Sequence, residues 1–159
     1  MRILGIDPGF ERMGVAIVEK EKGGKEKLIF SECFKTSKSL AFADRLLLIG
    51  EELERVTKKY KPELLGIETL FIETNQKTAM RVSEARGVML YIAQKNGLKI
   101  CEYSPLQIKV AVTGYGKADK RAVMTMVPKL LEVKSDHAMI DDELDAIAVA
   151  LTAIAHEKI

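Results

Sequence analysis

A short apolar run near the start of the chain ends in an acidic residue and is followed at once by a turn. Ile3–Ile6 forms the run, and Pro8 and Gly9 stop it directly after Asp7. Such a run is typical of a strand that is buried on both faces of a sheet. Asp7 is therefore predicted at the carboxyl end of a buried strand, the edge where open α/β sheets bind ligands. Taken alone, Asp-Pro-Gly is more often a plain turn, so acidic sites further along the chain must decide between the two interpretations.

A helix and a second acid-ended strand follow. Apolar residues recur at helical spacing in Phe42–Tyr60, and Leu64–Glu68 is again a short apolar run that finishes in a carboxylate. A strand, a helix and a strand in sequence imply a right-handed parallel crossover. The two strands can then be neighbours, and Asp7 and Glu68 should meet at one edge of the sheet.

The other predicted elements complete a mixed α/β fold. Further strands are expected over Met13–Glu19, Leu28–Thr36 and Leu98–Tyr103, and further helices over Thr78–Asn96, Ser104–Val112, Asp119–Leu131 and Asp142–His156. The prediction is a five-stranded mixed sheet, with three antiparallel strands and then parallel crossovers, flanked by helices. Pro128 should kink its helix or end it early.

Length and composition indicate one globular domain over residues 1–159. The chain is 47% hydrophobic and 30% charged, and it contains no apolar run of membrane-spanning length. Because its start lacks a signal-peptide pattern, we expect a cytoplasmic protein. The net charge is only +2, but the lysine-rich stretch Ser104–Lys134 precedes the acidic stretch Ser135–Asp145. This arrangement suggests a polyanion held over a cation site.

Two acids begin the last predicted helix. Asp142 and Asp145 are three residues apart and share one face of its first turn, while Asp141 either joins them or caps the helix. The ordinary interpretation is a solvated helix start whose charges match the helix dipole. However, this helix must pack on the sheet that carries Asp7 and Glu68, and converging carboxylates are costly unless a cation neutralises them. Oxygen ligands favour Mg²⁺ or Mn²⁺, and two such ions can promote phosphodiester hydrolysis.

Motifs in a fixed order along nearly the whole chain resemble one family. They are Gly5–Gly9 with Gly14, Ile67–Phe71 with Asn75, Ala85–Gly87, Glu102–Pro105 with Lys109, Ala111–Ala118 with Lys120, and Asp142–Ala146. Together they resemble the RuvC family of Holliday-junction resolvases, which have a ribonuclease H-like fold. The resemblance implies a homodimer that binds four-way DNA junctions in recombination and repair and nicks two strands symmetrically. It also implies a branch-migration motor complex of the RuvA and RuvB type as partner.

The same resemblance implies the metal ligands. Two Mg²⁺ ions, replaceable by Mn²⁺, would be held by four acids, which are Asp7, Glu68, Asp142 and Asp145. Some family members carry His at the Asp142 position. The chain departs from the family pattern in three places: Ser135–Ile140 lacks a proline, Pro128 interrupts a helix, and Glu73 puts an acid in a loop expected to face DNA.

Six residues are predicted to contact DNA: Phe71, Asn75, Arg86, Lys109, Lys117 and Lys120. Phe71 either stacks on a base freed at a distorted junction or folds back onto the core. Lys120 is also a candidate for stabilising charge on the scissile phosphate, although both it and Lys109 could simply hold backbone phosphates. Arg86 either pairs with Glu84 or reaches DNA, and the sequence leaves both open.

The helix over Thr78–Asn96 is apolar on two sides. One side is predicted to face the sheet, and the other, with Met80, Gly87 and Tyr91, to form a two-fold dimer interface. Three other functions compete with junction cleavage: processing of structured RNA, silent junction binding and an actin-like ATPase. Four converging acids argue against a silent binder, and one domain is too short for the paired lobes of an actin-like ATPase.

Overall fold

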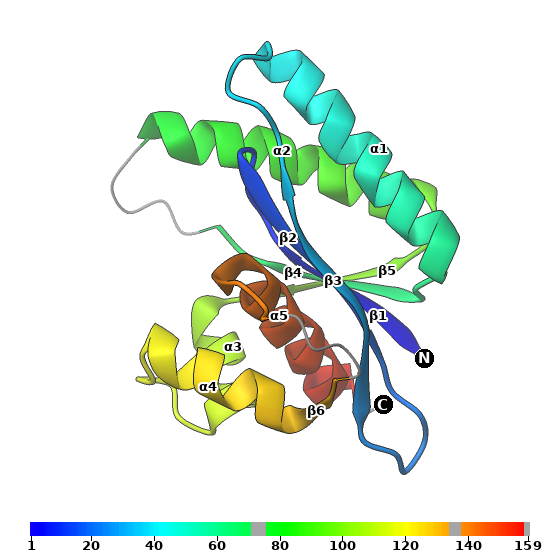
Figure 1. Ribbon diagram of the computed structural model, residues 1–159, viewed down its shortest axis with the longest axis vertical. Helices are drawn as coiled ribbons and strands as arrows, with labels where there is room; N and C mark the ends of the chain where they lie inside the picture. Colours follow the sequence, from blue (N-terminus) through cyan, green and yellow to red (C-terminus); the bar gives the residue numbers. More distant parts are fainter. Residues whose placement is uncertain (71–75, 134–137, 158–159) are drawn as a thin grey trace.

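The computed structural model describes residues 1–70, 76–133 and 138–157 (Figure 1). Within these residues, six strands form one mixed sheet in the order β5-β4-β1-β2-β3-β6. The strands are β1 Arg2–Asp7, β2 Arg12–Glu19, β3 Glu26–Lys35, β4 Leu64–Glu68, β5 Lys99–Tyr103 and β6 Leu131–Glu132. The helices are α1 Phe42–Tyr60, α2 Gln76–Lys95, α3 Pro105–Thr113, α4 Lys120–Leu130 and α5 Asp141–Glu157.

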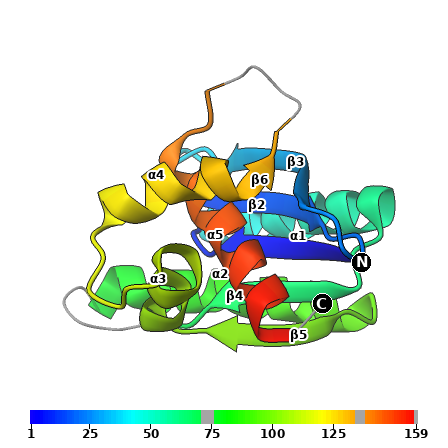
Figure 2. The ribbon, with the colours of Figure 1, turned by 90° about the horizontal axis from the view of Figure 1, so that it is seen from below.

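Helices cover both faces of the sheet (Figures 1 and 2). Alternate residues of β1 separate the two layers of the core, with Leu4 and Ile6 on one face and Ile3 on the other. Helices α1 and α2 pack on the first face, and α3, α4 and α5 lie on the second. None of the described helices is long and apolar enough to cross a membrane.

The predicted strand–helix–strand unit is confirmed. Helix α1 has the predicted bounds, and β1 pairs in parallel with β4, with Ile6 opposite Ile67. Strands β1, β2 and β3 are antiparallel, as expected, and β4 pairs in parallel with β5. The next residues along β1 and β4 are the two acids, so both lie at the same edge of the sheet.

One detail of the predicted fold is wrong, and one of two expected alternatives is not seen. The sheet has six described strands instead of five, because Leu131–Glu132 pairs in parallel with Glu26 and Lys27 of β3. A strand of two residues is too short to produce an alternating pattern. Of the two outcomes expected at Pro128, an early end is not seen, since α4 continues to Leu130, while a kink stays a prediction. The proline removes the one bond that an N–H at position 128 would make to the Met124 carbonyl, and the helix continues for only two residues beyond it.

Helix α5 lies close to the sheet because the strands beneath it carry glycines. A Cβ atom at Gly5 would lie 2.1 Å from the backbone oxygen of Ala146, and one at Gly14 would lie 2.0 Å from that of Asp142. Gly66, the neighbour of Gly5 on β4, would meet Val149 at 3.2 Å. No side chain fits at Gly5 or Gly14, and Gly66 leaves only tight room, so the glycines set the height of the helix above the sheet. They also bring the first turn of α5 over the ends of β1 and β4.

Candidate active site

Four acids, which we name the acidic quartet, gather at one edge of the sheet: Asp7, Glu68, Asp142 and Asp145. Asp7 ends β1 and Glu68 ends the parallel neighbour β4. Both are partly buried and point to the face that α5 covers, as Gly5 and Gly66 two residues earlier do. The strand pairing alone therefore sets these two carboxylates side by side.

The first five residues of α5 supply the other two members. The helix begins at Asp141, whose side chain is 69% exposed, whereas the Asp142 side chain is only 18% exposed. Asp145 lies one turn later on the same side as Asp142. The alternative in which Asp141 caps the helix is not adopted, because Asp141 is its first helical residue and faces solvent.

The electrostatics of Asp7 reflect the crowding of negative charge. Burial, and then the nearby carboxylates of Asp145, Glu68 and Asp142, raise the pKa of Asp7 to about 7. Burial and Asp145 also raise the pKa of Glu68 above its usual range. The quartet thus has more negative charge than its own surroundings neutralise, a condition that favours a bound cation.

Two basic side chains partly offset this charge. Lys120 Nζ lies 2.8 Å from Asp145 Oδ2 and 3.9 Å from Asp141 Oδ2. The Arg12 guanidinium forms an ion pair with Asp142 and, by hydrogen bonding, holds the pKa of that carboxyl below its usual range. Lys120 therefore lies at the site, as predicted, although its role in catalysis stays a prediction.

The quartet fits a divalent cation in its chemistry. All four ligands are carboxylate oxygens, which suit Mg²⁺ or Mn²⁺. As the side chains lie, no three Asp, Glu, His or Cys residues within the described ranges form a group that could hold a metal ion. Because Lys120 and Arg12 engage Asp145 and Asp142, assembling a metal site requires these two carboxylates to exchange partners.

A pocket of about 250 Å³ opens beside Glu68 and Asp145. Its wall is formed by residues of α3 and α4, namely Pro105, Ile108, Lys109, Lys120 and Val123. Helix α3 presents Lys109 there because a capping box fixes the start of the helix: Ser104 Oγ accepts a hydrogen bond from Gln107 N–H, and Gln107 Oε1 accepts one from Ser104 N–H. The pocket thus joins two acids of the quartet to two lysines.

The remaining predicted DNA contacts are distributed differently. Phe71 and Asn75 lie outside the described residues, as does Glu73. Lys117 is exposed in the turn between α3 and α4. Arg86 donates to the backbone oxygen of Glu68 at 3.1 Å and pairs with Glu102, while Glu84 pairs with Arg81. Arg86 therefore supports the end of β4, and its contact with DNA stays a prediction.

Two residues at the site were missed from the sequence. Arg12 reaches Asp142 across 130 positions of the chain, a separation that no local pattern reveals. Glu143 is buried and accepts hydrogen bonds from Ser31 Oγ at 2.7 Å and from Ile140 N–H at 3.1 Å. An acid at the third position of a helix is a known capping signal, so Glu143 was open to prediction.

Comparisons with known proteins identify the family of the chain. A sequence profile described as "Crossover junction endodeoxyribonuclease RuvC" matches residues 3–153. Proteins of that name from Fusobacterium nucleatum and Caldicellulosiruptor saccharolyticus are 40% and 44% identical to this chain over 154 residues. Those alignments cover 97% of this chain and 80% and 92% of the two relatives.

A solved structure extends the likeness to three dimensions. The structure titled "T. thermophilus RuvC in complex with Holliday junction substrate" matches with a TM-score of 0.91 at 30% identity. The match covers 99% of this chain and 95% of that one. With its ribonuclease H-like fold and a profile match over most of its length, the chain belongs to the RuvC family of crossover junction endodeoxyribonucleases.

Proposed function

We propose that residues 1–159 form one endonuclease domain that resolves four-way DNA junctions by hydrolysing one phosphodiester bond in each of two symmetry-related strands. The observation that carries the proposal is the convergence of the acidic quartet at the sheet edge, in a member of the RuvC family. The quartet is proposed to hold two Mg²⁺ ions, with Mn²⁺ able to replace them. The Thermus thermophilus relative was solved with a Holliday junction, which supports the substrate.

The residues of the chain have separate parts in this proposal. When bound, the metal ions would activate water and stabilise the leaving oxygen. Asp7 and Glu68 offer ligands fixed by the sheet, and the first two turns of α5 offer Asp142 and Asp145 from above. The Lys120 ammonium group leaves Asp145 and pairs with a phosphate oxygen. There its positive charge stabilises the negative charge that develops during hydrolysis. Lys109, on the other wall of the pocket, holds the adjacent phosphate.

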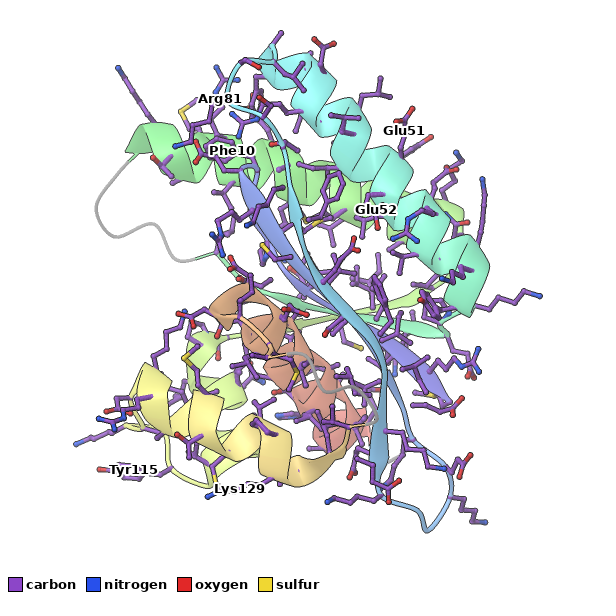
Figure 3. The ribbon with its side chains drawn as sticks, in the orientation of Figure 1. Phe10, Glu51, Glu52, Arg81, Tyr115 and Lys129 are labelled. Atoms are coloured by element: carbon purple, nitrogen blue, oxygen red, sulfur yellow. The ribbon has the colours of Figure 1, made fainter. Side chains whose placement is uncertain are left out.

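The proposed DNA surface continues over the side of the molecule that α3 and α4 form. Lys117 is exposed there, and Figure 3 shows Tyr115 and Lys129 projecting outward from the same side. Lysines spaced along one side can follow a phosphate backbone. Phe71 and Asn75 complete the proposed interface, Phe71 by stacking on an unpaired base.

The proposed enzyme acts as a two-fold dimer through the outer side of α2. Met80 and Tyr91 are 66% and 65% exposed, and Leu47 of the neighbouring α1 is also exposed. Nothing lies within 4 Å of a Cβ atom at Gly87, so a partner helix has room to approach. Such a dimer would present two active sites to symmetry-related strands.

We further propose a cytoplasmic location and a motor partner of the RuvA and RuvB type, since resolution must follow branch migration on chromosomal DNA.

A cleavage assay tests the proposal. A labelled immobile four-way junction is incubated with the protein, with and without Mg²⁺, beside a linear duplex and a structured RNA. We expect paired nicks at symmetry-related positions of the junction only, and only with the metal. Cleavage of the RNA with the junction left intact would instead assign the chain to RNA processing.

A further inference from the structure

Arg12 holds the whole carboxylate of Asp142. Its Nε lies 3.2 Å from both carboxylate oxygens, and its Nη2 makes a further short contact with Oδ2. A guanidinium presents its donors in a planar fork that matches a carboxylate. Both oxygens of this member of the quartet are therefore engaged by a protein cation.

The sheet places Arg12 at this position. Arg12 begins β2, two residues before Gly14, so both lie on the face that α5 covers. Gly14 is paired with Asp7, and the backbone oxygen of Asp142 lies directly above Gly14. The Asp142 carboxylate is thereby bonded to Arg12 and also lies close enough to Asp7 to act on it electrostatically. Close packing of α5 on the sheet thus brings the arginine and the acid together.

A divalent ion and Arg12 cannot both approach Asp142 without penalty. An ion ligated by Asp142 would lie a few ångströms from the guanidinium, and like charges at such distances repel by about 1 kcal/mol in water and by more at a partly buried site. Lys120 competes in the same way for Asp145, but it has a proposed part in the chemistry. Arg12 has none, so its pairing with Asp142 needs a separate explanation.

We propose that Arg12 is a positioning residue that serves as an exchangeable counter-ion for Asp142 and must leave that carboxylate before a metal ion occupies its side of the quartet. Arg12 thereby holds Asp142 in place while the site is free of metal, and it raises the metal concentration at which the site fills. The inference rests on the proposed function, because it requires the quartet to bind metal.

Calorimetric titration with Mn²⁺ tests this role without measuring cleavage. Arg12→Gln should bind Mn²⁺ with an apparent Kd lower than that of the wild type, by roughly threefold or more. Arg12→Lys should fall between the two, since an ammonium group cannot span both oxygens. In EDTA the melting temperature of Arg12→Gln should be lower than that of the wild type, because Asp142 then faces Asp7 without a cation. A damaged site would weaken metal binding, so tighter binding separates this role from a merely structural one.

Arg2→Gln is the matched control. Arg2 pairs with Glu19 at the opposite end of the sheet, and the two pairs have similar side-chain exposure: 40% and 22% for Arg2 and Glu19, against 49% and 18% for Arg12 and Asp142. Arg2→Gln removes the same charge as Arg12→Gln and should leave the Mn²⁺ affinity unchanged. If Arg12→Gln binds Mn²⁺ as the wild type does, or more weakly, the counter-ion role is overturned while the metal site stands. If the wild type binds no Mn²⁺, the proposed metal site is overturned and the role of Arg12 with it.

Discussion

Asp7 sits where the sheet and the last helix converge, and its ionisation should govern the stability of the metal-free protein. Its pKa of about 7 in the fold lies above the ordinary value of 3.8 that the unfolded chain would have. The folded state therefore retains a proton that the unfolded state loses. The contribution of protonated Asp7 to the free energy of unfolding is fully present below about pH 4. It is lost as the pH rises towards about 7.

We accordingly expect the melting temperature in EDTA to fall between about pH 4 and pH 7. Asp7→Asn should remove part of that fall, since an amide does not ionise, and the rest belongs to Glu32 and Glu68, whose pKa values burial also raises. At pH 8 in EDTA, Asp7→Asn should melt above the wild type, and Mg²⁺ should stabilise only the wild type. Differential scanning calorimetry across this pH range measures both effects. Asp141→Asn, at an exposed position, should follow the wild type, and identical pH profiles for all three proteins would refute the explanation.

Cleavage should depend on the four acids of the quartet and not on other acidic residues nearby. Asp7→Asn, Glu68→Gln, Asp142→Asn and Asp145→Asn should each abolish cleavage of a four-way junction while binding stays intact or tightens, because each removes a ligand and also repulsion towards phosphate. Gel-shift and cleavage assays on the same junction separate the two effects. Asp141→Asn makes the same charge change one residue before Asp142 and should retain most activity. If Asp141→Asn is inactive and Asp142→Asn is active, the proposed ligand set is wrong at this helix.

Gly14 should be intolerant of even a methyl group. In Gly14→Ala the new Cβ would lie 2.0 Å from the backbone oxygen of Asp142, so the first turn of α5 must move away from the sheet. We expect a lower melting temperature together with loss of cleavage. Gly24→Ala, where the nearest atom is 3.4 Å away, is the control and should be close to neutral in both measurements. A Gly14→Ala protein with full activity would mean that the height of α5 is not critical for the site.

At the scale of elements, α5 is more deeply buried than its sequence indicates. Helical spacing predicts that Leu144, Ala148, Leu151 and Ala155 form one core stripe. The first three are buried and Ala155 is exposed, which corrects that prediction, and nearly all residues from Glu143 to Ile154 are buried as well. The helix lies between the sheet and the layer of α3 and α4 (Figure 2). Small residues face the strands because the glycines bring the helix close, a requirement that periodicity in the helix alone does not reveal.

Glu143 should fix the start of α5 and hence the orientation of Asp142 and Asp145. Glu143→Ala removes acceptors for Ser31 Oγ and Ile140 N–H and should cost about 1 kcal/mol or more in the free energy of unfolding. Glu143→Gln can bond to both partners and should retain most of the stability. Urea unfolding measures the stability. Titration with Mn²⁺ measures the metal affinity, which depends on the orientation of Asp142 and Asp145. Equal losses for the two variants would show that the charge of Glu143 matters more than its hydrogen bonds.

At the scale of the whole molecule, the proposed dimer interface on α2 can be tested by a substitution at Gly87. Gly87→Arg should leave the chain folded, because nothing lies within 4 Å of the new Cβ, but it should prevent a partner helix from approaching. We expect a monomer by sedimentation and loss of coordinated paired nicking. Gly24→Arg makes the same exchange in the β2–β3 turn and should stay dimeric. A wild-type protein that is monomeric at micromolar concentration and still makes paired nicks would contradict the dimer.

The success of prediction followed the range of the interactions. Local signals sufficed for α1, for the capped start of α3 and for the strand ends that carry Asp7 and Glu68. Parallel pairing then placed these two acids together, and helical spacing distinguished Asp142 and Asp145 from their neighbours. Strand β6 and the Arg12–Asp142 pair were missed because both arise from contacts between distant segments. The positions of Phe71 and Asn75 in the proposed interface stay predictions.

The seating of α5 on β1 also determines when during synthesis the proposed nuclease can become active. The ribosome delivers β1 first and α5 only after every other described element, so the acidic quartet is divided between early and late segments of the nascent chain. A chain that has not reached Asp141 carries two of the four acids and leaves the glycine-lined face of its central strands uncovered. A nascent chain has a complete quartet only once Asp145 has been added, so no shorter fragment carries the whole proposed metal site.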